Sequence, residues 1–282
     1  MLIHDFFNLL NDNKDIEAVA LLNDAPHTPE ADALRGYAMY YGIGGTPEDD
    51  ERAFLIFENG VAAGDSLSQY MLGIMCEDAS TPDQAEGGPR QKYDWYDAER
   101  FMTLCAENTE GAFAGMAWLW LGKYFIDSTR GEDPELGEEY LEKAADADFD
   151  EAAEILRDRA EDRAEYYDWQ DVEANGCLLR WQQRMYEINP HDESYAYGRL
   201  FSGVPGIPEN LRLALKLYEE DYEFGHSQGA RALALHYEAR AEDPALALAD
   251  RAEAKVLAQA WHERADQNAE NDFPPEQIIE ED

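Results

Sequence analysis

Positive charge is scarce in this sequence. Its 282 residues include 22 Lys and Arg against 62 Asp and Glu, which gives a formal net charge of −40 at pH 7. Only 6 of the basic residues are lysine. Phosphate contacts need clustered Lys and Arg, so the composition argues against direct nucleic-acid binding. It also argues against docking on an anionic membrane surface.

Long apolar runs and paired cysteines are missing as well. No stretch approaches the roughly 18 apolar residues of a membrane-spanning helix. Residues 1–7 carry neither the basic segment nor the small-residue cleavage site of a secretory signal. The three cysteines, Cys76, Cys105 and Cys177, are odd in number and widely spaced. We therefore expect buried thiols in a reducing compartment, with the cytoplasm as the location.

The composition nevertheless predicts a folded chain, because 45% of the residues are hydrophobic and 12% are aromatic. Its acidity has two explanations, and the sequence leaves both open. Proteins of a salt-adapted organism carry few lysines and many acids. Alternatively, the negative surface is complementary to a strongly basic partner. Such a surface accelerates association with that partner and disfavours binding of other proteins.

Helical periodicity dominates the chain, and alternating strand-like runs are absent from the sequence. Breaks rich in glycine and proline separate segments long enough for one or two helices, for example at 42–47, 131–134 and 203–206. A repeat emerges when these segments are aligned on a small residue in the first helix of each pair. This crossing position falls at Gly36, Gly73, Gly122, Arg157, Gly198 and Ala234.

The second helix of each pair has a matching pattern. It opens with a small residue, at Ala53, Ala98, Gly137 and Ala214, and mostly bulky residues follow three and four positions later. A residue without bulk at the crossing position lets two antiparallel helices approach closely. A single pair cannot bury its apolar face, so neighbouring pairs must stack into a solenoid.

This pattern resembles the Sel1-like repeat, a relative of the tetratricopeptide repeat with a longer, glycine-marked period. The resemblance is carried by Gly36 with residues 42–45, by residues 68–73 and 140–145, and by Gly198 with Gly206, Ala214 and Gly225. It implies an all-α, right-handed solenoid of antiparallel helical hairpins. It also implies a non-enzymatic protein-binding scaffold, since proteins of this class serve as adaptors and regulators, and some bacterial ones are partners or immunity proteins of secreted toxins.

The expected organisation has three parts. Residues 1–29 form an N-terminal capping hairpin, in which Phe6, Leu9 and Leu10 face Ile16, Val19 and Leu22. Residues 30–265 form one continuous repeat solenoid, which is degenerate around 157–175, where Arg157 replaces the small residue. Residues 266–282 contain acids, Pro274 and Pro275 but no Lys or Arg, and we expect a mobile tail.

Catalytic and metal-binding motifs find little support. Residues 146–150 resemble the start of a calcium loop, but Glu151 stands where that loop needs Gly and Arg157 where it needs Glu. No His or Cys pair has zinc-ligand spacing, and no serine lies in a nucleophile-elbow motif. We expect neither catalysis, nor a cofactor, nor a metal.

Aromatic residues near the crossing positions form a better candidate site. Residues one position after it (Tyr37, Ile74 and Lys123) and two before it (Met71 and Trp120) should lean toward a concave groove. Exposed aromatics among carboxylates suit a basic protein surface, through stacking on arginine and charge pairing. The predicted partner-binding residues are Tyr37, Tyr41, Met71, Ile74, Glu77, Asp78, Trp118, Trp120 and Tyr124. The alternative is that they only pack between repeats.

The leading hypothesis is a scaffold whose acidic groove captures a basic protein. Its most concrete form is an immunity protein that occludes a secreted bacterial toxin or effector. The second hypothesis is a nucleic-acid mimic, whose carboxylates imitate phosphates in the groove of a DNA-binding protein. The third is a general adaptor scaffold of a salt-adapted organism, in which the acidity serves no particular partner.

Overall fold

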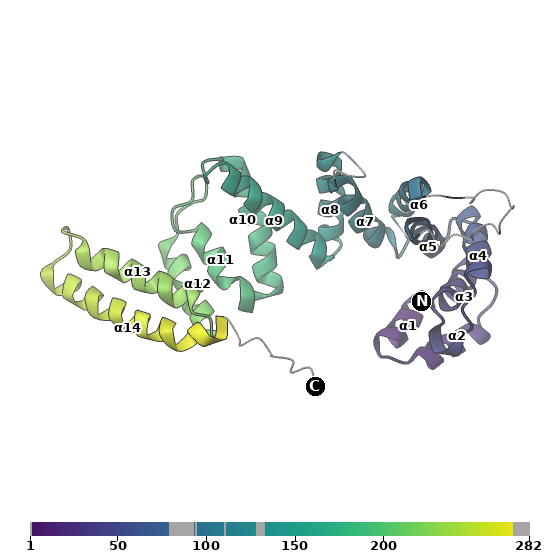
Figure 1. Ribbon diagram of the computed structural model, residues 1–282, viewed down its shortest axis with the longest axis horizontal. Coiled ribbons are helices and arrows are strands. Elements are labelled where there is room, and N and C mark those ends of the chain that lie inside the picture. Colours follow the sequence, from purple (N-terminus) through teal and green to yellow (C-terminus); the bar gives the residue numbers. More distant parts are fainter. Residues whose placement is uncertain (1, 79–92, 94, 110, 128–132, 273–282) are drawn as a thin grey trace, which may run out of the picture. The chain divides into compact units, whose positions relative to one another are not determined.

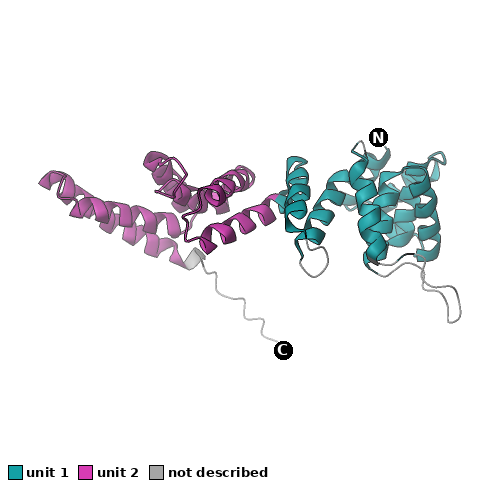
Figure 2. Ribbon diagram, turned by 90° about the horizontal axis from the view of Figure 1, so that it is seen from above, with its two compact units in different colours: residues 1–152 teal, residues 153–282 magenta. Residues whose placement is uncertain are grey.

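The computed structural model describes residues 2–78, 93, 95–109, 111–127 and 133–272, and every regular element in these ranges is helical (Figure 1). The all-α prediction is therefore confirmed. The chain divides into two compact units, Met1–Ala152 and Ala153–Asp282 (Figure 2). No helix in the described ranges combines the length and the low polarity needed to span a bilayer.

The helices are described in the order in which they follow one another along the chain. Unit 1 contains α1 (Leu2–Asn11), α2 (Asp15–Asn23), α3 (Pro29–Tyr40), the 3-10 helix η1 (Ile43–Gly45), α4 (Asp50–Ala62), α5 (Ser66–Glu77), α6 (Trp95–Glu107), α7 (Ala114–Ile126) and α8 (Pro134–Asp146). Helix α9 (Asp150–Tyr166) begins at the end of unit 1, and unit 2 continues with α10 (Val172–Ile188), α11 (Pro190–Leu200), α12 (Leu211–Glu223), α13 (Gln228–Glu242) and α14 (Leu248–Asp272).

Local sequence sets where many of these helices begin. The side chains of Thr28, Asp49, Asp65, Asp133, Asp171 and Asn210 each accept a hydrogen bond from a backbone amide of the first turn that follows. Such caps satisfy amides that have no partner inside the helix. The local sequence thus favours the start of a helix at each of these six positions.

Paired helices cross at the glycines that the alignment singles out. A Cβ on Gly73 would lie 2.7 Å from Met102 Cε, and one on Gly122 would lie 2.6 Å from Leu141 Cδ2. A Cβ on Gly36 would lie 2.9 Å from the ring of Phe57, and one on Gly198 would lie 3.0 Å from the ring of Tyr218. Each of these bulky residues lies four positions after the small residue that opens the second helix. The predicted register of the repeat is confirmed at these four crossings.

The N-terminal helices pack as a pair against the first repeat. Phe6, Ala18 and Leu22 are buried, whereas Ile16 is 75% exposed, so the prediction that it faces α1 is wrong. Helix α2 presents Ala18 and Leu22 to the core, and this places Ile16 on its outer surface. Helix η1 packs closely against the start of α2. Gly44 of η1 has a φ of +60°, and a Cβ there would lie 2.6 Å from the Asp15 carbonyl oxygen.

The degenerate region, residues 157–175, covers the later part of α9, a turn and the start of α10, and both helices are 17 residues long. Helix α9 continues through residues 161–163, where the other repeats turn, and α10 begins only at Val172. Arg157 occupies the crossing position, and its guanidinium donates a hydrogen bond of 2.9 Å to Glu193 of α11. Ala160 and Ala164 pack with Leu178 and Leu200 in a small core of their own.

The C-terminal helix α14 runs through Asp272, so residues 266–272 of the predicted tail are helical. The amide of Asn268 accounts for the extension, because it donates hydrogen bonds to the carbonyl oxygens of Tyr222 and His226 at 3.1 and 3.2 Å. Residues 273–282, the remainder of the predicted tail, lie outside the described residues.

The three cysteines do not share one environment. Cys76 and Cys105 are buried, as the sequence predicted, but Cys177 is exposed. The prediction for Cys177 is wrong because α10 turns Ala174 and Leu178 toward the core and leaves Cys177 on the opposite face.

Candidate functional site

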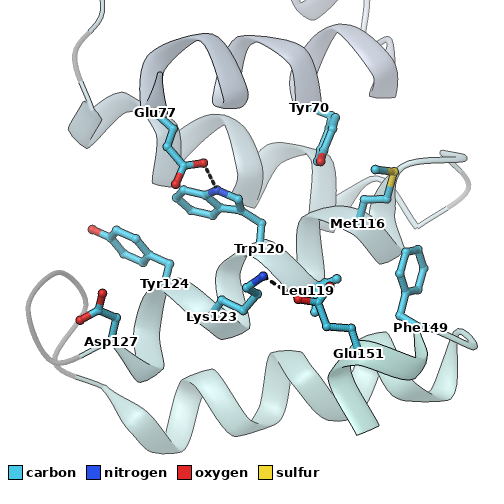
Figure 3. A pocket seen from close by; sticks show the side chains of 10 residues that line it. All are labelled: Tyr70, Glu77, Met116, Leu119, Trp120, Lys123, Tyr124, Asp127, Phe149 and Glu151. Carbon is cyan, nitrogen blue, oxygen red and sulfur yellow. Dashed lines mark hydrogen bonds and ion pairs between the residues drawn. The ribbon is translucent and has the colours of Figure 1, made fainter. Parts of the chain in front are cut away.

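A cavity of about 500 Å³ opens on the surface of unit 1 (Figure 3). Helices α5 and α7 supply most of its walls, and the end of α7, the turn between α8 and α9 and the first turn of α9 supply the rest. It is lined by Tyr70, Glu77, Met116, Leu119, Trp120, Lys123, Tyr124, Asp127, Phe149 and Glu151. We call this surface the groove.

Helices α5 and α7, the first helices of two successive repeats, present similar faces to the groove. On α5, Tyr70 and Glu77 lie three positions before and four after the crossing residue Gly73. On α7, Leu119 lies three positions before Gly122 and Lys123 one after it. Residues four and seven apart share a helix face, so this spacing aligns the lining residues of successive helices.

Trp120 is held in place from both sides. Its indole Nε1 donates a 2.6 Å hydrogen bond to Glu77 Oε2, which joins α7 to α5 (Figure 3). Its ring stacks on Tyr124 with a centroid separation of 5.0 Å and an interplanar angle of 13°. The hydroxyl of Tyr124 in turn donates to Glu99 Oε2 at 3.2 Å. Trp120 is therefore an aromatic platform with a fixed orientation.

The other end of the groove is closed by the α8–α9 turn. Lys123 Nζ forms an ion pair of 2.7 Å with Glu151 Oε1. The ring of Phe149 packs over Gly115 so closely that a Cβ there would overlap it. Gly115 thus lets the turn approach α7 and brings Glu151 to the cavity.

The charge of the groove is negative. Glu77, Asp127 and Glu151 are its acidic lining residues and Lys123 is its basic one, so the lining charge is 1 − 3 = −2. Asp78, next to Glu77, is also exposed. Guanidinium and ammonium groups of a partner fit this surface by charge.

The tyrosines beside the groove are neutral hydrogen-bond donors. Burial, reinforced by Cys105, Tyr37 and Glu77, raises the pKa of Tyr70 to about 12. Burial and the neighbouring Tyr37 raise the pKa of Tyr41 further still. Neither phenol ionises in the physiological range, so both keep their protons and can donate to a partner.

Three of the nine predicted partner-binding residues line the groove: Glu77, Trp120 and Tyr124. Tyr41 and Asp78 are exposed beyond it, while Tyr37, Ile74 and Trp118 are half-buried and pack against the core. Met71 is 0% exposed, so its assignment to the groove is wrong. Met71 lies two positions before its crossing glycine and belongs to the core of unit 1. Trp120 has the same register on α7, but it is only partly buried and bonds Glu77 in the groove.

Tyr70, Met116, Leu119, Asp127, Phe149 and Glu151 line the groove but were not among the predicted residues. Tyr70 and Leu119 carry a signal that could have found them, because both lie three positions before a crossing glycine. Phe149 lies within the calcium-like string, in the turn between α8 and α9, and Glu151 follows that string in the first turn of α9. That string forms a tight turn in which Asp148 has a φ of 63°, and its sequence does not indicate that it closes a groove.

Comparison with known proteins finds likeness in structure only. No family model matches the chain, and no curated protein matches it. The structure of a Sel1 repeat protein from Oxalobacter formigenes aligns with 94% of this chain and 96% of its own, at 17% identity and a TM-score of 0.49. The structure of c5321, a protective antigen of uropathogenic Escherichia coli with an SLR fold, aligns with 94% of this chain and 61% of its own, at 14% identity and a TM-score of 0.50.

An immunity protein, Pa5087 from Pseudomonas aeruginosa, aligns with 90% of this chain and 91% of its own at 14% identity. Its TM-score of 0.21 is too low to carry an argument. The likeness to c5321, the crossings at four glycines and the all-helical architecture agree with one another. The chain has the fold of the Sel1-like repeat proteins, an all-α solenoid of antiparallel helical hairpins.

Proposed function

We propose that this protein is a non-enzymatic scaffold that captures a basic protein in the groove of unit 1. The most concrete form of this proposal is an immunity protein that neutralises a bacterial toxin by covering the toxin's basic functional surface. The observation that carries the proposal is Trp120, a half-buried indole fixed between Glu77 and Tyr124 at the edge of an acidic cavity.

The chemistry of the groove supports a basic partner. Tryptophan and tyrosine dominate the binding energy of protein interfaces, because a rigid aromatic ring buries a large area with little loss of entropy. An arginine of the partner can stack on the Trp120 ring and pair with Glu77 or Asp127 at the same time. The 62 acidic residues of the chain add long-range attraction, which raises the association rate.

The fold supports a binding role as well. Solenoids of helical repeats present extended surfaces to other proteins, and the first helices of their repeats line those surfaces. The ten lining residues include no serine, cysteine or histidine, the side chains that most often act as nucleophile or general base. We therefore propose occlusion of a partner and not chemistry on a substrate.

Affinity capture with matched variants tests the proposal. The wild-type protein, the double variant Trp120→Ala/Glu77→Gln and the control Tyr166→Ala are each immobilised and exposed to lysate of the source organism. Tyr166 is 82% exposed and lies in unit 2, so its removal takes an aromatic ring from the surface without touching the groove. We expect a basic protein that the wild type and the control retain, that the groove variant loses, and that salt elutes.

Two further measurements separate the forms of the hypothesis. If the captured protein is a toxin, its expression alone arrests growth and co-expression with the wild type, but not with the groove variant, restores it. A nucleic-acid mimic would instead retain many DNA-binding proteins and release them to duplex DNA. Equal retention by the wild type and the groove variant would refute the groove as the binding surface.

A further inference from the structure

Three ligating side chains converge in unit 2, in a region separate from the groove. His191 and Asp192 lie in the first turn of α11, and His226 lies in the turn between α12 and α13. One nitrogen or carboxylate oxygen of each lies within 4.8 Å of the other two. The sequence gives no hint of this cluster, because 34 positions separate Asp192 from His226.

A buried carboxylate orients His226. Asp221 is 2% exposed, and its Oδ1 lies 3.2 Å from His226 Nδ1. Its other oxygen accepts a 2.6 Å hydrogen bond from the backbone amide of Gly229, so the carboxylate is fixed on both sides. When Nδ1 carries the proton of this contact, the lone pair of Nε2 is available, and Nε2 lies 4.0 Å from Asp192 Oδ1.

His191 and Asp192 complete the cluster. The imidazole rings of His191 and His226 meet edge to face at 4.9 Å, and the ring of Phe224 lies 4.9 Å from His191. Asp192 Oδ1 lies 2.8 Å from His191 Nδ1, and its Oδ2 accepts a hydrogen bond from Asn189. Both the imidazoles and the carboxylate therefore have restricted positions before any ligand binds.

We propose that His191, Asp192 and His226 form a binding site for a first-row divalent metal ion of the zinc type. Two imidazole nitrogens and one carboxylate oxygen suit Zn²⁺, Co²⁺, Ni²⁺ or Cu²⁺, whereas Mg²⁺ and Ca²⁺ prefer oxygen ligands alone. Asp221 serves as the outer carboxylate that fixes the tautomer of a ligating histidine. Three protein ligands leave a coordination position for water or for a group from another molecule.

His262 provides an internal comparison. Its Nε2 lies 2.9 Å from Glu238 Oε1, on the surface of the same unit, so it is also a histidine paired with a carboxylate. It is not part of the three-residue cluster, and Glu238 is half exposed, unlike Asp221. If a metal merely associates with the acidic surface and with single histidines, replacing His262 and replacing His226 should change its affinity equally.

Calorimetric titration with ZnCl₂ tests the site on the full chain. The buffer is near neutral pH, where free imidazole is mostly unprotonated, and holds an excess of Mg²⁺ to occupy the acidic surface. We expect one tight equivalent of Zn²⁺ for the wild type and for His262→Ala. His191→Ala and His226→Ala should each weaken this equivalent by at least about 10-fold, and Asp221→Asn by about 10- to 100-fold.

Folding is checked separately, because Asp221 is buried. A titration is interpreted only for variants that retain the circular dichroism spectrum and melting temperature of the wild type. Asp192→Asn, at an exposed position, provides a milder test of the ligand set. Titration with Co²⁺ gives a second readout, since ligation by nitrogen produces visible absorption bands that the two histidine variants should lose. Unchanged Zn²⁺ binding in folded His191→Ala and His226→Ala, or its abolition by Mg²⁺, would refute the site.

Discussion

The indole of Trp120 and the carboxylate of Glu77 join two successive repeats across the groove with a hydrogen bond of 2.6 Å. The bond links α7 to α5 and sets the orientation of the aromatic ring before a partner arrives. A side chain that is already fixed loses little entropy on binding. The same contact therefore contributes both to the packing of unit 1 and to the readiness of its candidate binding surface.

We predict that Trp120→Phe lowers the free energy of unfolding by about 1–2 kcal/mol, because it removes the donor to a charged acceptor and retains most of the ring. Glu77→Gln keeps an oxygen acceptor for the indole and should lose less. Urea unfolding followed by circular dichroism measures both. A larger loss for Glu77→Gln than for Trp120→Phe would show that the bond is not what holds the ring.

A second prediction concerns the crossing glycines. Gly122→Ala places a methyl group 2.6 Å from Leu141 Cδ2 and 3.1 Å from the Gly137 carbonyl oxygen. The helices must separate or Leu141 must change rotamer, which should cost about 1–3 kcal/mol of stability. Gly176→Ala is the matched control, because it lies inside α10 with no atom within 4 Å of its Cβ. That substitution should stabilise the protein by about 0.5–1 kcal/mol.

Thermal melting of the two alanine variants gives the comparison directly. Opposite signs would show that close helix approach, and not helix propensity, explains glycine at the crossing position. Equal stabilisation by both substitutions would contradict the role of Gly122.

These crossings explain why the fold could be predicted from sequence. Gly36, Gly73, Gly122 and Gly198 meet Phe57, Met102, Leu141 and Tyr218 by steric fit between consecutive helices. In each pair the bulky residue lies four positions after the small residue that opens the second helix, and this offset can be read from the sequence. Residues 157–175 could not be predicted in the same way. Arg157 fits no small-residue pattern, and its partner Glu193 lies 36 positions away, where nothing in the sequence marks it.

Only part of the groove could be predicted from the sequence, and the reason is geometric. Residues three before and one after a crossing glycine differ by four positions and share a face, so Tyr70 lies beside Ile74 on α5. The predicted positions were one after the glycine, where Lys123 does line the groove, and two before it, which on α5 is the buried Met71. Phe149 in the α8–α9 turn and Glu151 at the start of α9 close the groove through tertiary packing, which the repeat pattern does not encode.

The pair formed by Arg157 and Glu193 leads to a third prediction. Their side chains are 17% and 13% exposed, and Glu193 also accepts a 2.7 Å hydrogen bond from Gln182. Arg157→Met should cost about 1.5–3 kcal/mol, because it removes a charge-assisted bond from a mostly buried carboxylate. Lys216→Met removes an exposed helical ion pair with Glu220 and should change stability little. A melting temperature that falls equally in both variants would contradict the structural role of Arg157.

Alkaline pH should destabilise the protein. Burial raises the pKa of the Cys105 thiol from 9.0 to about 12, and that of Tyr70 from 10.0 to about 12. At a pH between the ordinary pKa of each group and its raised pKa, the folded state holds a proton that the unfolded state has lost. The free energy of unfolding therefore falls as pH rises above 9. Urea midpoints at a series of pH values measure this decline. Midpoints that stay constant across that range would contradict the burial of these two groups.

The last prediction concerns the net charge of −40. Repulsion among the carboxylates opposes the compact state, so added NaCl should raise the melting temperature. The Debye length is about 10 Å at 0.1 M salt and about 3 Å at 1 M, so screening is largely complete before molar concentrations. If the acidity serves a basic partner, the melting temperature should rise steeply at low salt and then level off. A melting temperature that keeps rising far into the molar range would favour adaptation to a salty cytoplasm, and one that does not respond to salt would show that the carboxylates repel each other too weakly to matter.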